Sequence, residues 1–133
     1  MRADGYVKGV RVELELAPID STHHMRTDAA EAFLAMRRAA NEAGIVLGVN
    51  SAFRGMGEQL RLRQAWMEGR GNLAARPGFS NHQGGIAVDI QTGGEGTAVY
   101  AWLAAHAAEF DFVRTVPSEP WHWEFRPTLS LEG

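Results

Sequence analysis

The segment from residue 80 to residue 90 reads SNHQGGIAVDI and marks the centre of the expected fold. From residue 86 onward, branched apolar residues alternate with Ala87 and Asp89, which is the period-two pattern of a half-buried β-strand. The apolar face belongs to the core, so Asp89 points to the other side, where the small Ala87 leaves room for a ligand. His82 precedes two glycines that interrupt the strand, so it lies on a loop and can turn back toward Asp89. The segment therefore predicts a core on one face and a functional cleft on the other.

A second segment with reactive side chains lies near the C-terminus, where residues 119–123 read EPWHW. Strand alternation predicts that Trp121 and Trp123 share one face and that His122 occupies the opposite face. The residue before a proline is biased toward an extended backbone, and this bend brings Glu119 over the site that His122 faces. The segment thus adds one imidazole and one carboxylate to the same cleft.

The two segments together provide the ligand types of a catalytic metal site. His82, Asp89 and His122 form a three-ligand set with an open fourth position, which is the pattern of catalytic zinc. An unligated carboxylate nearby can accept a proton from the attacking water. Taken singly, each residue also has a structural interpretation, since a strand histidine is often only a hydrogen-bonding group and Asp89 can form a turn. The combination of the three residues is stronger evidence for a metal site than any one of them alone.

Three other histidines are assigned structural roles. His106 is spaced like a residue at the periphery of a helical core face, and His23 and His24 lie in a loop. Because His23 and His24 are adjacent, they remain an alternative metal pair. The sequence alone does not decide between this pair and the set of His82, Asp89 and His122.

The composition excludes several classes of protein. The 133 residues are 45% hydrophobic and 22% charged, which suits a single globular domain spanning residues 1–133 with a loose tail at 127–133. The net charge of −3 and the scattered arginines argue against a nucleic-acid partner. The chain has no cysteine, so a metal site must use His, Asp or Glu. No apolar stretch is long enough to span a membrane, and the first residues lack the apolar core of a signal peptide. We expect a monomer.

The remaining patterns predict an α+β fold with a small antiparallel sheet and about three helices, because strands and helices mix without strict alternation. Pro18 ends the first strand, and Asp28 with Glu31 resembles a capping box that starts the first helix. Gly44 ends that helix. The expected strands cover residues 10–16, 45–50, 85–90, 111–116 and 121–125; the expected helices cover 28–44, 58–67 and 97–109; a long loop covers 69–81.

Three motifs together resemble the zinc D-alanyl-D-alanine carboxypeptidases and dipeptidases, a family that includes vancomycin-resistance D,D-peptidases and phage L-alanyl-D-glutamate endopeptidases. The motifs are SNHQGGIAVD at 80–89, EPWH at 119–122, and SAFR at 51–54 followed by Gln59. The resemblance covers roughly residues 27–126. Ala52 departs from the family pattern, which usually has Gly there. The implied fold is the small α+β fold shared with the hedgehog signalling domain.

The resemblance also implies a role for each residue of the motifs. His82, Asp89 and His122 would bind Zn²⁺. Glu119 would act as general base and then as general acid. Arg54 would polarise the scissile carbonyl and stabilise the oxyanion, a role that suits a permanently charged fork.

Other positions are expected to help bind the substrate or to compete for the role of base. Ser80 and Gln59 would be substrate contacts. Glu124 is the competing general base, expected on the strand face opposite His122, near solvent and the neighbours of Trp123. The expected substrate is the peptidoglycan stem peptide, cut either by a D-Ala-D-Ala carboxypeptidase or by an L-Ala-D-Glu endopeptidase. Such an enzyme acts on the cell wall, whether exported or delivered by a phage or a secretion system.

Two rival functions are weighed against a peptidase. A hedgehog-like zinc module that binds cell-wall or protein ligands without catalysis would lack the base or the arginine, yet Glu119 and Arg54 are both present. A non-haem iron oxygenase also uses two histidines and one carboxylate. Its carboxylate usually follows the first histidine by two residues, whereas Asp89 follows His82 by seven. Both comparisons favour the peptidase.

Overall fold

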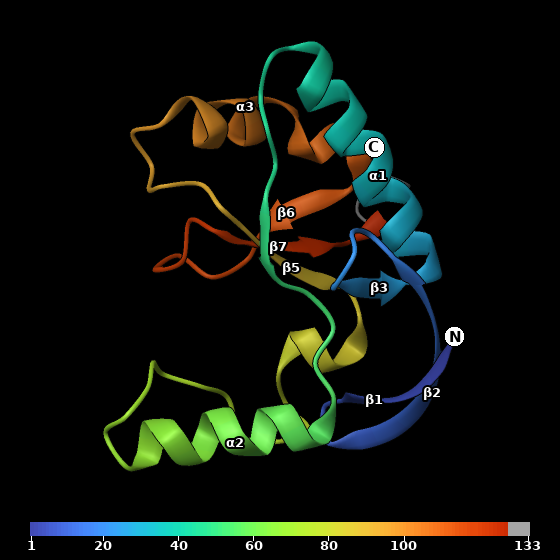
Figure 1. Ribbon diagram of the computed structural model, residues 1–133, viewed down its shortest axis with the longest axis vertical. Coiled ribbons are helices and arrows are strands. Elements are labelled where there is room, and N and C mark those ends of the chain that lie inside the picture. The colour runs from blue at the N-terminus through green and yellow to red at the C-terminus, as the bar shows by residue number, and fades with distance from the viewer. Residues whose placement is uncertain (128–133) are drawn as a thin grey trace.

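The computed structural model describes residues 1–127 and has an α+β fold, which confirms the expected class (Figure 1). Within this range there are three α-helices and two short 3₁₀ helices. The helices are α1 (Thr27–Glu42), α2 (Met56–Met67), α3 (Ala98–His106), η1 (Asn81–Gly84) and η2 (Ala107–Phe110). The strands are β1 (Arg2–Val7), β2 (Val10–Pro18), β3 (His24–Arg26), β4 (Val49–Ser51), β5 (Ala87–Ile90), β6 (Phe112–Arg114) and β7 (His122–Phe125). Residues 128–133 of the predicted loose tail lie outside the described residues.

The strands form two antiparallel sheets, with the orders β1-β2-β3 and β4-β5-β7-β6. In the second sheet β5 pairs directly with β7, although 31 residues separate Ile90 from His122. The register places Asp89 opposite His122. Residues directly opposite on antiparallel strands have side chains on the same face, so this pairing alone brings two of the candidate ligands together.

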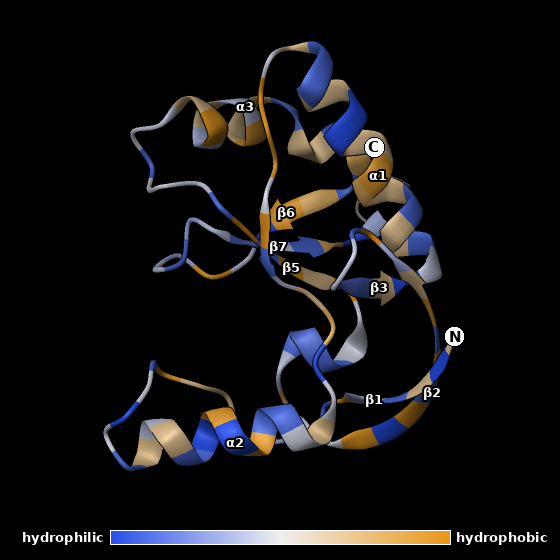
Figure 2. Cartoon of the chain, viewed as in Figure 1, coloured by the Kyte–Doolittle hydropathy of each residue, from blue (hydrophilic) through white to orange (hydrophobic). Residues whose placement is uncertain are grey.

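The core lies on the other face of the second sheet, where α1 packs. Phe33 and Met36 of α1 are fully buried, together with Val88 and Ile90 of β5. The rings of Phe33 and Phe112 meet edge to face with centroids 6.3 Å apart. Burial of each such side chain contributes about 1.5–3 kcal/mol. Figure 2 shows the apolar residues along β6 and α3. The core thus fixes the sheet whose opposite face carries the polar residues.

A strand at the N-terminus, β1, was not expected from the sequence. Its residues include Asp4 and Gly5, which are poor strand formers and obscure the alternation. The strand forms because the chain turns tightly at Lys8 and Gly9, whose φ angles of 51° and 82° are both positive. This is the geometry of the two-residue hairpin turn that matches strand twist. β1 therefore pairs with β2 along its whole length.

The first helix begins one residue earlier than expected, and the capping box is wrong. The N-cap position is Arg26, without a capping side chain, and Asp28 instead accepts hydrogen bonds from the Arg26 guanidinium at 2.7 and 2.9 Å. The carboxylate is therefore occupied by its neighbour. Gly44, with φ of 78°, follows the helix end as predicted.

Other element boundaries shift by a few residues. The strand expected at 45–50 is limited to β4, and the helix expected at 97–109 divides into α3 and η2. The side chain of Thr97 caps α3 by accepting a hydrogen bond from the backbone N–H of Tyr100 at 3.1 Å. Among the described residues, no helix combines the length and apolar character needed to cross a membrane.

Candidate metal centre and active-site cleft

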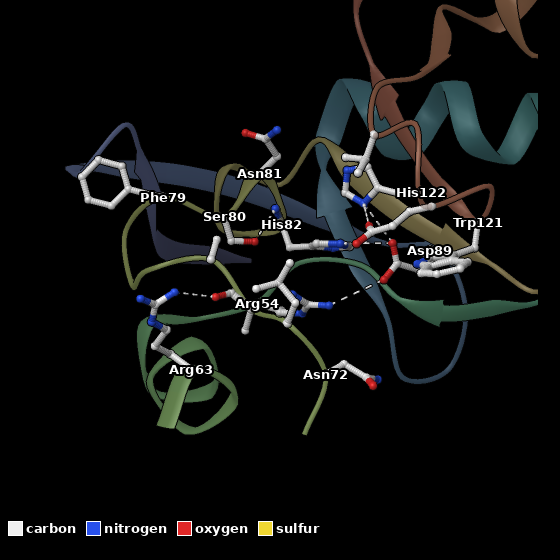
Figure 3. Close-up of a pocket in the computed structure, with 15 residues that line it drawn as sticks. Arg54, Arg63, Asn72, Phe79, Ser80, Asn81, His82, Asp89, Trp121 and His122 are labelled. Atoms are coloured by element: carbon white, nitrogen blue, oxygen red, sulfur yellow. Dashed lines mark hydrogen bonds and ion pairs between the residues drawn. The ribbon is translucent and has the colours of Figure 1, made fainter. Parts of the chain in front are cut away.

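Three potential metal ligands converge on the polar face of the second sheet. Asp89 Oδ1 lies 3.2 Å from His82 Nε2 and 3.1 Å from His122 Nδ1 (Figure 3). These three residues offer ligand atoms that all lie within 4.8 Å of one another. They come from η1, β5 and β7, so the site depends on long-range pairing and not on one local motif.

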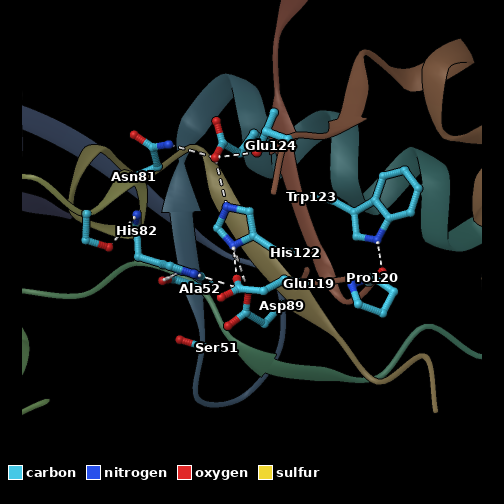
Figure 4. Close-up of polar contacts among 12 residues, drawn as sticks. Ser51, Ala52, Asn81, His82, Asp89, Glu119, Pro120, His122, Trp123 and Glu124 are labelled. Carbon is cyan, nitrogen blue, oxygen red and sulfur yellow. Dashed lines mark hydrogen bonds and ion pairs between the residues drawn. The ribbon is translucent and has the colours of Figure 1, made fainter. Parts of the chain in front are cut away.

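Each imidazole ring is oriented by the nitrogen that faces away from Asp89. His82 donates its Nδ1–H to the carbonyl oxygen of Ala52 at 2.8 Å, which leaves Nε2 directed at Asp89. His122 donates its Nε2–H to Glu124 Oε2 at 2.8 Å, which leaves Nδ1 directed at Asp89 (Figure 4). A ligating histidine normally has its second nitrogen held in this way, because the bond fixes the tautomer and the ring orientation.

The donor set fits a tetrahedral zinc ion. Bonds of about 2.0–2.1 Å at a tetrahedral ion place neighbouring ligand atoms about 3.3 Å apart. The separations of 3.1 and 3.2 Å from Asp89 Oδ1 to the two nitrogens are close to this value. Two neutral imidazole nitrogens and one carboxylate oxygen are also the ligand types that zinc accepts. The three side chains therefore offer a donor set that suits zinc.

Electrostatic coupling keeps the carboxylate of the cluster ionised. Burial alone would raise the pKa of Asp89, but hydrogen bonds with His122 and His82 outweigh it and hold that pKa well below its usual range. Burial would lower the pKa of His122, whereas its hydrogen bonds with Asp89 and Glu124 raise it to about 9. Asp89 therefore supplies an ionised oxygen ligand, and a cation that binds here must displace the proton that His122 shares with it.

Glu119 lies at the edge of this cluster in the loop between β6 and β7. Its Oε1 is 3.8 Å from His122 Nδ1, and its side chain is 31% exposed. The loop is closed by two backbone hydrogen bonds, from Glu119 N–H to Val116 and from His122 N–H to the Glu119 carbonyl. Glu119 is therefore near the ligand atoms but remains accessible to water, as a proton acceptor must be.

Arg54 lines the same cleft and approaches the Asp89 carboxylate. Its Nε donates to Ser51 Oγ at 3.1 Å, its Nη1 to Gln59 Oε1 at 3.4 Å, and its Nη2 lies 3.6 Å from Asp89 Oδ2. Three anchors on different nitrogens hold the guanidinium plane in one orientation. Ala52, the departure from the family pattern, has its side chain buried in the core.

The cluster opens into a cleft of about 470 Å³. Ser80 is on its wall and is 8% exposed, and its hydroxyl accepts a hydrogen bond from the backbone N–H of His82. Gln59 is completely buried and does not line the cleft; its amide donates to the Ala75 carbonyl at 2.8 Å. The lining residues are Arg54, Arg63, Asn72, Leu73, Ala74, Ala75, Phe79, Ser80, Asn81, His82, Asp89, Val116, Glu119, Trp121 and His122.

Two sequence-based expectations about the C-terminal segment are wrong. Trp121 does not share the face of Trp123: β7 begins at His122, and Trp121 lies in the preceding turn, 40% exposed on the cleft wall. Glu124 lies neither near solvent nor on the face opposite His122; it is fully buried and accepts a hydrogen bond from His122. The physical reason is that residues two apart on a strand share a face, so Glu124 lies beside His122.

Sequence reasoning also missed part of the cleft wall. Residues 72–75 of the long loop lie against the cleft, and Arg63 of α2 holds them by donating to the Ala74 carbonyl at 2.9 Å. The absence of periodicity identified the loop but could not show which way it folds. The alternative pair His23 and His24 does not belong to a metal cluster of three or more ligands within residues 1–127; His23 pairs with Asp20 at 2.9 Å.

Comparisons with known proteins agree with this geometry. The family model described as D-alanyl-D-alanine carboxypeptidase, VanY, matches residues 22–128. A curated D-alanyl-D-alanine carboxypeptidase of Enterococcus faecalis is 39% identical over a region that covers 38% of this chain. That region is only 24% of the length of the enterococcal protein.

Solved structures with related folds include a D,D-pentapeptidase, VanYB and an LD-carboxypeptidase. A vancomycin-resistance D,D-pentapeptidase, VanY, in complex with Zn(II) has a TM-score of 0.71 and 25% identity, covering 84% of this chain and 78% of that one. VanYB in complex with D-alanine-D-alanine has a TM-score of 0.71 and 26% identity, covering 86% and 78%. The LdcB LD-carboxypeptidase has a TM-score of 0.71 and 25% identity, covering 84% and 64%.

Proposed function

Because the chain belongs to the VanY family of D-alanyl-D-alanine carboxypeptidases, we propose that it is a zinc peptidase that removes the C-terminal D-amino acid from peptidoglycan stem peptides. The observation that carries this proposal is the triangle of His82, Asp89 and His122 at the floor of an open cleft. Glu119 and Arg54 flank the triangle on two sides. A cell-wall substrate also places the enzyme's action at the cell wall.

The three residues of the triangle would hold the ion. His82 would ligate through Nε2, His122 through Nδ1 and Asp89 through its carboxylate, since these atoms face one another. Zinc, when bound with an open fourth position, lowers the pKa of its bound water to about 7 and so supplies a nucleophile at neutral pH. A related VanY structure contains Zn(II), which supports this choice of metal.

Glu119 would move the protons of the reaction. It accepts one from the attacking water and later gives one to the departing amine, so a single carboxylate serves both halves of the hydrolysis. Its position 3.8 Å from His122 Nδ1 places it beside the ligands but outside the triangle. Its partial exposure allows it to reach a water or a substrate nitrogen.

Arg54 would stabilise the charge that develops on the carbonyl oxygen. Its guanidinium is fixed by Ser51 and Gln59 before substrate arrives, so no reorganisation is needed during the reaction. The Nη2 group lies 3.6 Å from Asp89 Oδ2 and therefore borders the reaction centre.

The shape of the cleft favours a peptide over a free dipeptide. The cleft extends from the triangle toward Arg63 and Asn72, and Figure 3 shows these two residues well away from Asp89. A dipeptidase needs a closed pocket that captures both ends of its substrate. The bound D-alanine-D-alanine in VanYB supports a substrate with that C-terminus.

The test is hydrolysis of a purified stem pentapeptide by the zinc-loaded protein, with products identified by mass spectrometry. We expect release of one terminal D-alanine, loss of this activity in excess chelator, and recovery with zinc. Release of a fragment cut at L-Ala-D-Glu would replace the carboxypeptidase by the endopeptidase. Binding of the peptide without any cleavage would instead favour a non-catalytic zinc module.

A further inference from the structure

Glu124 is a fully buried carboxylate that the proposed chemistry does not use. Its Oε2 accepts hydrogen bonds from His122 Nε2 at 2.8 Å, from Asn81 Nδ2 at 2.7 Å and from Thr115 Oγ1 at 2.7 Å. Its Oε1 accepts from Arg126 Nη2. Figure 4 shows this carboxylate above the His122 ring, on the side away from Asp89. One carboxylate thus joins the segments that carry His82, His122 and Glu119.

A carboxylate at this position is a costly way to fill space. Removing a charged group from water costs several kcal/mol unless it is paired, and an apolar residue of similar size often gives equal or greater stability. The neighbouring positions on β7, Trp123 and Phe125, show that apolar residues fill the other face of the same strand. Four hydrogen-bond donors, from His122, Asn81, Thr115 and Arg126, surround the buried Glu124 carboxylate. The fold has therefore built a specific site for this negative charge.

We propose that Glu124 is a positioning residue that locks the Nε2–H of His122 and thereby presents Nδ1 of that ring to the zinc ion. If the acceptor were lost, the ring could rotate or change tautomer, and its two nitrogens would no longer be distinguished. The acceptor is anionic and buried, so its bond to the ring is stronger than a bond to water.

The same carboxylate links the ring to its surroundings. Asn81 immediately precedes His82, and Thr115 begins the loop that carries Glu119. Glu124 holds both through single hydrogen bonds. Displacement of Glu124 would therefore disturb one metal ligand directly and the segments of a second ligand and of the proposed base indirectly. The position of Glu124 explains why a charged residue occupies the middle of a buried strand.

The chain contains a matched control for this contact. Glu109 Oε2 lies 2.8 Å from His106 Nδ1 and forms a hydrogen bond with it. The Glu124–His122 hydrogen bond has the same length. The control pair is exposed, with side-chain exposures of 45% and 62%, and contributes nothing to the cleft lining. Glu109→Gln therefore makes the same chemical change in a Glu–His pair that holds no proposed ligand.

The experiment measures zinc affinity of the full chain by competition with a chromophoric chelator. We expect the dissociation constant for zinc to rise about 10-fold in Glu124→Gln and about 100-fold in Glu124→Ala, the range typical of residues that orient metal ligands. Glu109→Gln should match the native protein. The glutamine variant retains the volume and one acceptor oxygen, so it remains informative if the alanine variant does not fold.

A second readout separates orientation from general stability. In the zinc-loaded native protein, ¹⁵N NMR should show the Nε2–H of His122 protected from exchange with water. In Glu124→Ala this proton should exchange rapidly, while the Nδ1–H of His82, bonded to Ala52, stays protected. Unchanged zinc affinity in Glu124→Gln, or an unchanged His122 proton in Glu124→Ala, would overturn the positioning role.

This role rests on the zinc site proposed above, and the two can fail separately. A native chain that binds no zinc refutes the metal site and the role of Glu124 with it. If the native chain binds zinc and both Glu124 variants bind it equally tightly, the role of Glu124 is refuted and the metal site stands.

Discussion

Two carboxylates lie near the same imidazole, and their surroundings give them different chemistry. Glu119 is 31% exposed and is 3.8 Å from His122 Nδ1, whereas Glu124 has no exposed surface and accepts four hydrogen bonds. Both oxygens of Glu124 accept hydrogen bonds, so this carboxylate could exchange a proton with a substrate only if some of those bonds broke. Glu119 is therefore the better proton acceptor.

Substitution of Glu119 tests this assignment. Glu119→Gln should lower kcat on a stem peptide by about 10²–10⁴-fold, the usual contribution of general base catalysis. It should leave zinc content unchanged, because Glu119 lies outside the ligand triangle. Steady-state kinetics with metal analysis check both points. If Glu124→Gln abolishes turnover at saturating zinc while Glu119→Gln remains active, the base is Glu124.

Arg54→Lys should be almost as damaging as Arg54→Ala. The guanidinium is held through three nitrogens by Ser51, Gln59 and Asp89, and a single ammonium cannot reproduce that arrangement. Loss of one donor to a developing oxyanion typically lowers kcat by about 10²–10³-fold. Because that interaction forms mainly in the transition state, KM should change little.

The kinetics of both Arg54 variants also distinguish catalysis from substrate binding. If Arg54 anchors the terminal carboxylate of the substrate, the defect should appear in KM, and lysine should restore much of it. That result would place Arg54 among the substrate-binding residues. It would also support a carboxypeptidase, because an endopeptidase has no free carboxylate beside its scissile bond.

The sequence was sufficient to select the residues of the triangle as candidates but not to arrange them. Asp89 and His122 lie opposite each other because β5 pairs with β7, and no local pattern encodes the partner of a strand. The burial of Glu124 could have been inferred from its spacing of two from His122. Its four hydrogen bonds could not, because Asn81 and Thr115 come from other segments.

At the scale of an element, the turn after η1 depends on one glycine. Gly85 has φ of 78°, and a Cβ there would lie 3.1 Å from the backbone nitrogen of Arg26. Its carbonyl also accepts a hydrogen bond from that nitrogen at 2.9 Å. The chain therefore turns sharply between His82 and β5 only because this residue has no side chain.

Gly85→Ala should reduce the free energy of unfolding by more than Gly44→Ala. Both glycines have φ of 78°, so the backbone strain of about 1 kcal/mol or more is common to both variants. Of these two glycines, Gly85 has neighbours within 4 Å of an added Cβ and Gly44 has none. Urea denaturation of the two variants measures the difference. Equal destabilisation would mean that the contact with Arg26 relaxes without cost.

Element prediction succeeded where a residue type acts locally. Pro18 ends β2 and Gly44 follows α1, because each restricts or frees its own backbone. It failed where a neighbour intervenes. Asp28 was expected to cap α1, but the guanidinium of Arg26 takes its carboxylate. β1 forms through its pairing with β2 and not through its own alternation.

At the scale of the whole molecule, the proposed zinc ion would join elements that are distant along the chain. His82 lies on η1, which contacts β1 of the first sheet, whereas Asp89 and His122 belong to the second sheet. A ligand that binds only the folded state adds RT ln(1 + [L]/Kd) to stability, or about 2.7 kcal/mol when free zinc is 100-fold above its dissociation constant.

Removal of zinc should therefore lower the Tm by about 10 °C in a chain of this size, and added zinc should restore it. Thermal unfolding followed by circular dichroism, in zinc, in excess chelator and after zinc is returned, measures the shift. His82→Ala is the control, because it deletes one ligand and should make the Tm nearly independent of zinc. A zinc-dependent shift that persists in His82→Ala would place the ion elsewhere. If the Tm of the native protein is the same in zinc and in excess chelator, the triangle does not bind the metal.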